Sequence, residues 1–194
     1  MARTPGTPHF LIRVQGQAED YPPLIDVSSF LWDFNQAYEI SRVATDQRYA
    51  PFVSSEGPRD PRGMIEDEDR LQVVALNENS PLVLLAIVAA TPAAVGAIWG
   101  LVQIVDKITN WPLNRQILKL QRDKLRSELQ RSEYPIQEFE KPEQFRQHLR
   151  DHEVSHLYDH VAGRLEFGKI RVTDFEITLL DDFPRNQRGT DVKG

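Results

Sequence analysis

The sequence predicts an α+β protein in which a small β-α-β head and a C-terminal helix-strand module are separated by one long apolar helix. Two patterns lead to this fold class. Short β-forming segments alternate with helical periodicity near both ends of the chain, and a 24-residue stretch without a charged side chain lies between them. We expect a head at residues 1–80, an apolar helix at 81–107, a basic amphipathic helix at 108–132, a C-terminal module at 133–183 and a flexible tail at 184–194.

The head begins with a predicted strand at residues 9–15, which are rich in β-formers. A proline pair then marks a turn. From residue 29 to residue 43 large apolar side chains recur near helical spacing with polar residues between them, which predicts an amphipathic helix. A loop at 50–69 carries prolines, glycines and an acidic run, and residues 71–76 form a second predicted strand.

The stretch from Leu82 to Val105 contains no charged residue. At about 1.5 Å rise per residue, a helix of this length covers a hydrocarbon core of roughly 30 Å. We therefore expect a transmembrane helix, in which Pro92 near the middle is tolerated better than in a soluble helix. Two alternatives stay open: a re-entrant hairpin folded at Pro92, or a helix buried in the core of the domain or in an oligomer.

Basic residues follow the apolar stretch directly. Residues 81–132 hold 7 Lys and Arg against 3 Asp and Glu, whereas the whole chain has a net charge of −6. Because basic residues favour the cytoplasmic side, the predicted location is the bacterial inner membrane with the C-terminal region in the cytoplasm. The basic stripe could instead pair with an acidic partner helix or face solvent. The residues expected at the membrane interface, against lipid headgroups, are Lys107, Trp111, Arg115, Lys119, Arg122 and Arg126.

Gly96 and Gly100 form a Gly-x-x-x-Gly pair within the apolar stretch, and alanines repeat the same spacing beside it. Small residues four apart let two helix backbones approach closely, so that van der Waals contact can hold the helices together. We therefore expect the chain to form homo-oligomers through this helix.

A helix predicted over about residues 141–165 contains His152-Glu153-Val154-Ser155-His156. The spacing matches the His-Glu-x-x-His pattern, in which two imidazoles one turn apart bind Zn²⁺ and the glutamate activates water. His152 and His156 are therefore the candidate metal ligands. No third-ligand motif follows, so a structural metal site, a pH-responsive cluster and ordinary surface histidines stay open. Residues 170–180 then alternate as a half-buried strand does.

Composition and motifs disfavour several classes of function. The chain has no cysteine, which rules out a disulfide scaffold and thiolate chemistry. Its acidic balance, without a basic patch interleaved with aromatic residues, argues against nucleic-acid binding. It has no Gly-rich phosphate loop and no Gly-x-Ser-x-Gly elbow, so we expect no cofactor apart from the candidate zinc. The sequence therefore favours a protein that is not an enzyme.

The order of a β-α-β head, an Asn-Ser-Pro-Leu junction, an apolar helix and a basic helix resembles a group of small, uncharacterised bacterial membrane-associated proteins. The residues that carry this resemblance are Tyr38-Glu39-Ile40 and Asn79-Ser80-Pro81-Leu82. The resemblance implies no assigned activity, and some proteins of this layout look like components of defence or stress systems.

Three functions are compatible with these observations. The first, which we expect, is a membrane-anchored interaction protein that self-associates and presents its α+β modules to an unidentified protein partner, as a defence or stress effector or adaptor. The second is a small membrane-linked zinc hydrolase that uses His152, Glu153 and His156. The third is a soluble assembly protein whose apolar helix is buried in an oligomer.

Overall fold

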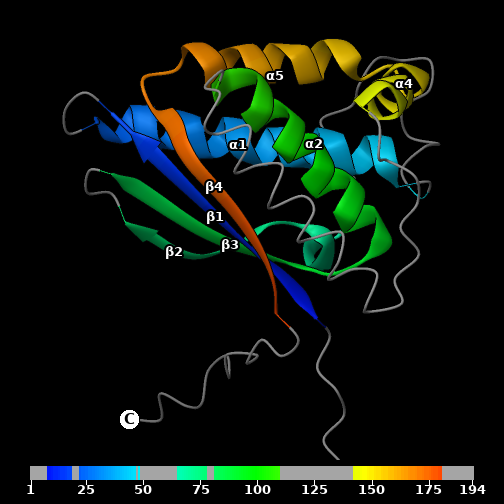
Figure 1. The fold of residues 1–194 in the computed structure, drawn as a ribbon, viewed down its shortest axis with the longest axis horizontal. Coiled ribbons are helices and arrows are strands. Elements are labelled where there is room, and N and C mark those ends of the chain that lie inside the picture. Colours follow the sequence, from blue (N-terminus) through cyan, green and yellow to red (C-terminus); the bar gives the residue numbers. More distant parts are fainter. Residues whose placement is uncertain are drawn as a thin grey trace, which may run out of the picture.

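The computed structural model describes residues 8–18, 22–46, 48, 65–77, 81–109 and 142–180. They form a four-stranded antiparallel sheet with helices gathered on one side of it (Figure 1). This confirms the predicted α+β class. The elements in chain order are β1 (His9–Gln17), α1 (Leu24–Thr45), the short 3-10 helix η3 (Asp67–Asp69), β2 (Gln72–Asn77), β3 (Leu82–Ala89), α2 (Pro92–Thr109), α4 (Pro142–Asp151), α5 (Ser155–Phe167) and β4 (Arg171–Leu180).

The strands lie in the order β2-β3-β1-β4, and each neighbouring pair is antiparallel. The central strand β1 pairs with two strands that are distant in the sequence, so that His9 lies opposite both Ala89 of β3 and Leu180 of β4. This is the split β-α-β arrangement of ferredoxin-like folds, which support many unrelated functions. The head, the apolar stretch and the C-terminal module therefore all contribute strands to one sheet.

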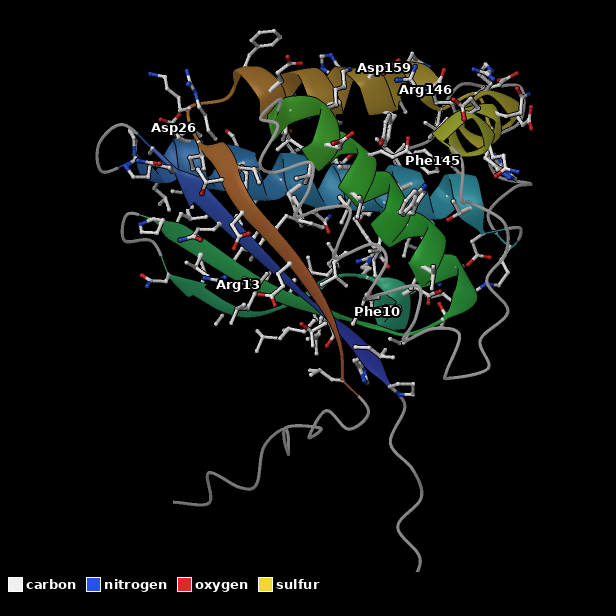
Figure 2. All side chains as sticks on the ribbon, viewed as in Figure 1. Phe10, Arg13, Asp26, Phe145, Arg146 and Asp159 are labelled. Atoms are coloured by element: carbon white, nitrogen blue, oxygen red, sulfur yellow. The ribbon has the colours of Figure 1, made fainter. Side chains whose placement is uncertain are left out.

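Alternation along β1 defines the two faces of the sheet. Phe10, Ile12 and Val14 are fully buried, whereas the residues between them are half buried. Figure 2 shows Phe10 and Arg13 on opposite sides of β1, with Phe10 on the side of the helices. The core between sheet and helices receives from α1 the side chains of Val27, Phe30, Phe34, Ala37, Tyr38, Ile40 and Val43.

The single apolar helix predicted over residues 82–105 is wrong. The first part of this stretch is strand β3 and the second part is helix α2. Thr91 separates them, because its Oγ1 accepts a hydrogen bond from the Ala94 amide at 3.2 Å and so caps the first turn of α2. Pro92 occupies the first helical position, where the missing amide hydrogen costs nothing. The proline that was expected inside a helix therefore begins one.

The transmembrane prediction is wrong for the same reason. Across the described ranges, no helix is both long and apolar enough to cross a bilayer. Most apolar side chains of the stretch are buried within the chain itself, and the alternative of a buried helix holds only for its second part, α2. The predicted location in the bacterial inner membrane, with a cytoplasmic C-terminal region, depended on that helix and is also wrong. The buried residues of β3 and α2 include Leu82, Leu84, Val88, Ala94, Ala97, Ile98 and Leu101.

Within the described residues, the other predicted helices and strands agree with the structure except in one place. The predicted strands correspond to β1, β2 and β4, and the predicted helix at 29–43 lies within the longer α1. The helix predicted over 141–165 is instead two helices, α4 and α5, because the chain turns at residues 152–154. At this turn Glu153 has a φ angle of 55°, which a helix interior does not allow.

Candidate interaction surface

The candidate zinc ligands lie at the junction of α4 and α5 and not on successive turns of one helix. His152 is in the turn, with Nδ1 2.8 Å from the backbone oxygen of His148, and His156 is exposed in the first turn of α5. In the part of the chain that the structure describes, no group of three or more His, Cys, Asp or Glu side chains is arranged to hold a metal ion. The zinc-hydrolase hypothesis therefore gains no support from the described residues.

Gly96 and Gly100 lie where α2 packs against α1. A Cβ atom at Gly96 would stand 2.6 Å from Cβ of Thr45, and one at Gly100 would overlap the hydroxyl of Ser41. Ser41 and Thr45 are also four residues apart, so two pairs of small residues face each other across the contact. This arrangement lets the two backbones approach closely. In the structure, the predicted Gly-x-x-x-Gly pair thus joins two helices of the same chain.

Lys107 is the one predicted membrane-interface residue within the described ranges. It lies in the last turn of α2, and its Nζ is 3.9 Å from a carboxylate oxygen of Asp159 on α5. Both side chains are largely exposed, so the pair contributes little to stability. The remaining predicted interface residues, Trp111, Arg115, Lys119, Arg122 and Arg126, lie outside the described residues, as does the predicted basic helix.

A cluster of buried charges lies where α1 ends. The guanidinium of Arg42 is fully buried, 2.6 Å from Oδ1 of Asp69 and 3.4 Å from Oδ2 of Asp46, and it also donates a hydrogen bond to the hydroxyl of Thr91. Arg48 contacts the same two carboxylates from the solvent side. Burial raises the pKa of Asp46, but hydrogen bonds from Arg48 and the charge of Arg42 outweigh this effect and hold the pKa below its ordinary value. The cluster therefore ties α1 to η3 and to the start of α2.

A second charged contact joins α1 to α5. Asp33 is nearly buried, and its Oδ1 lies 2.5 Å from Nη2 of Arg164, whose side chain is 44% exposed. Burial raises the pKa of Asp33, and the positive charges of Arg164 and His160 offset this only in part. Loss of hydration therefore disfavours the charged carboxylate more than its basic neighbours favour it. This is typical of a structural ion pair that is open to water at one end.

The sheet face opposite the helices is a candidate site for binding. We call it the open face, because none of the described helices covers it. Strand pairing places on it the residues of β1 that alternate with the buried ones, and their neighbours on β3 and β4. Ile87 is 6% exposed, and its apolar neighbours are half buried. The larger apolar members of the open face are Leu11, Val83, Leu85, Ile87 and Leu180.

A charged group crosses the open face beside these apolar side chains. Nη1 of Arg13 on β1 lies 3.1 Å from Asp174 and 3.9 Å from Glu176 of β4. The three side chains are between 35% and 46% exposed, so water screens the pairs and they add little to stability. Strand pairing also places Arg171 on this face, opposite Gln17, so the described residues of the open face include two cations and two carboxylates, and the charge is negative only around Arg13.

The sequence pattern alone does not identify the open face. Its apolar residues on β3 lie in a stretch that has no strict period of two, and β4 lies about 160 residues after β1 in the chain. The alternation of residues 170–180, which predicts a strand with one exposed face, is the local signal that points to it. Comparisons with protein-family models, with curated proteins and with solved structures give no match for this chain.

Proposed function

We propose that the chain is a non-enzymatic interaction module that binds a protein partner on its open face. The observation that carries this proposal is the set of five apolar side chains that three strands place side by side there. An apolar sheet face is stable when a second layer packs on it. The polar clusters of the described residues are ion pairs that join structural elements, which supports binding rather than catalysis.

The charge of the open face defines the chemistry of the partner. Asp174 and Glu176 outnumber Arg13 where these three side chains meet, whereas Arg171 adds a second cation at the end of the face, opposite Gln17. A complementary surface carries an apolar patch with Lys or Arg placed against Asp174 and Glu176.

The size of the open face predicts a weak complex. Strands about 4.8 Å apart and roughly eight residues long, at about 3.3 Å per residue, give four strands a footprint of roughly 500 Å². Standard interfaces bury about 800 Å² on each partner. We therefore expect a transient complex with a dissociation constant in the micromolar range, on the order of 1 µM or weaker.

Photo-crosslinking in the native host tests the proposal. A photoreactive amino acid replaces Gln15 on the open face, and a matched control replaces Glu166, which is exposed on α5. We expect a protein to be captured from position 15 and not from position 166. The captured protein is then purified, and its affinity is measured for the wild type and for the charge reversals Glu176→Lys and Glu166→Lys.

Glu176→Lys is expected to weaken binding about tenfold, because it reverses a charge inside the contact, whereas Glu166→Lys leaves the affinity unchanged. Added salt should also weaken wild-type binding, because it screens the charges at the contact. Equal capture from both positions, or an affinity insensitive to Glu176→Lys, would overturn the proposal. Capture of a second copy from position 15 would also overturn it, since the proposed partner is a different protein.

A further inference from the structure

The two edges of the sheet differ in chemistry. β4 forms one edge and carries Arg171, Asp174 and Glu176. β2 (Gln72–Asn77) forms the other edge and contains neither a charged residue nor a proline. Charged side chains and prolines are common means by which proteins prevent an edge strand from pairing with another chain. The edge at β4 has this protection and the edge at β2 lacks it.

The apolar residues of β2 do little for the core of their own chain. Val73 is 61% exposed and Val74 is 46% exposed. Leu76 is the half-buried member of the strand, and it packs against the core. In the described residues β2 pairs with β3 on one side. A β-forming, uncharged strand whose valines remain in water is a template for a further strand.

We propose that β2 pairs with β2 of a second copy of the chain, antiparallel and about a twofold axis, so that the two sheets join into one. Such an interface is isologous, and each residue of the strand meets a residue of the same strand. Because Gln72–Asn77 contains no charge, this pairing brings no like charges opposite each other. The inference is independent of the proposed function, because it concerns the edge of the sheet and not its open face.

Two features limit the strength of this dimer. Six residues at about 3.3 Å each give a paired length of about 20 Å, so the interface is smaller than the roughly 1,200 Å² at the lower end of stable complexes. The register with β3 also shifts between Val73 and Ala75, and a bulge of this kind increases the local twist. We therefore expect a concentration-dependent dimer, with a dissociation constant on the order of 10 µM.

Analytical ultracentrifugation of the full chain over a range of concentrations tests the pairing. Val73→Lys places a charge on the β2 edge, and Thr173→Lys places the same charge on an exposed position of the β4 edge. We expect Val73→Lys to raise the dissociation constant at least tenfold and Thr173→Lys to leave it unchanged, with both variants keeping the wild-type melting temperature. A wild type that stays monomeric, or a dimer that Val73→Lys does not weaken, would overturn the inference.

Disulfide trapping tests the geometry without depending on a charged substitution. The chain contains no cysteine, so each single-cysteine variant reports on one position. In this pairing Val74 lies opposite Ala75 of the other copy, so oxidation of an equimolar mixture of the Val74→Cys and Ala75→Cys variants should link them into dimers, because a disulfide requires Cβ atoms about 3.8 Å apart. Thr173→Cys should stay monomeric under the same conditions. Trapping of Thr173→Cys as fast as the β2 variants, or no trapping on β2, would exclude this pairing.

Discussion

Helix α1 meets α2 and α5 in two different ways. On the side of α2 the backbones approach closely through Gly96 and Gly100, and the guanidinium of Arg42 is sealed from water. On the side of α5 the contact depends on longer side chains, and the ion pair between Asp33 and Arg164 reaches solvent. In Figure 1 α5 runs nearly parallel to α1, whereas α2 crosses α1 at an angle.

The difference follows from the local dielectric and from packing density. A charge that is fully buried must keep its partner, because an unpaired ion in a medium of low dielectric costs several kcal/mol. A pair that reaches water loses little when one member is removed. Close backbone contact likewise leaves no space for an added methyl group, whereas a looser contact does. The α2 side should therefore respond strongly to substitution and the α5 side weakly.

Removal of the carboxylate that pairs with Arg42 should have the largest effect. Asp69→Ala leaves the buried guanidinium without its closest counter-ion, and we expect it to lower the free energy of unfolding by about 3–5 kcal/mol in urea titrations. The matched control is Asp67→Ala, in the same short helix, since the side chain of Asp67 is 96% exposed. The two variants should differ clearly, and equal stabilities would show that Arg42 does not depend on Asp69.

The same Gly→Ala substitution at two positions should change the stability of the fold in opposite directions. Gly100→Ala forces a Cβ into Ser41 and Phe145, and we expect a loss of about 1–3 kcal/mol despite the better helix propensity of alanine. Gly163→Ala on α5 meets no atom within 4 Å, so it should stabilise the protein by up to about 1 kcal/mol. Thermal unfolding of both variants measures this difference. Destabilisation by both alanines would mean that α5 packs as tightly as α2.

Lowering the pH should destabilise the cluster of buried charges around Arg42, because Asp46 then becomes protonated. Its folded-state pKa lies below the ordinary value of 3.8, so its ionised form is favoured in the fold. The resulting stability is fully present above 3.8 and is lost as the pH falls through the lower folded-state pKa. We expect Asp46→Asn to be less stable than the wild type near neutral pH, with a difference that shrinks in acid. A difference that does not change with pH would contradict this linkage.

Replacement of Asp33 should have the smallest effect on stability, and this effect should be opposite in direction to that of replacing Asp46. The folded-state pKa of Asp33 is raised above 3.8, so the ionised carboxylate is slightly disfavoured in the fold. Asp33→Asn should therefore match or slightly exceed the wild-type stability near neutral pH, by less than about 1 kcal/mol, and this difference should vanish once the pH falls below 3.8. Chemical denaturation at several pH values measures it. A marked loss of stability would mean that this ion pair is as important for the fold as the buried ion pairs of Arg42.

Local patterns are sufficient for the elements with one clear period. Alternation predicts β4 and helical spacing predicts α1, while β-forming residues bounded by turn residues predict β1 and β2. Residues 82–105 have neither period, because both of their halves are buried on nearly all sides, and length then favours a single helix. The signal that separates the two halves is Thr91-Pro92, a capping residue followed by the residue preferred at the first helical position.

The geometry around the two histidines and the open face could not be predicted from the sequence. Nothing between His152 and His156 is a strong helix breaker, yet the chain turns there because α4 and α5 pack separately on α1. The open face needs the pairing of β1 with β3 and β4, and these contacts join segments from three distant parts of the chain. No local pattern encodes such a register, because it depends on which apolar surfaces the whole fold buries together.

The sequence by itself determined the α+β class, most element positions and the presence of a small-residue pair suited to close helix packing. Only the tertiary structure decided what that pair packs against. A spacing of four residues places Gly96 and Gly100 on one face of α2 in any environment, since helix geometry is local. Their neighbour is α1 of the same chain, where Ser41 and Thr45 leave the matching space. That choice depends on the burial of the whole apolar stretch, which no short window of sequence contains.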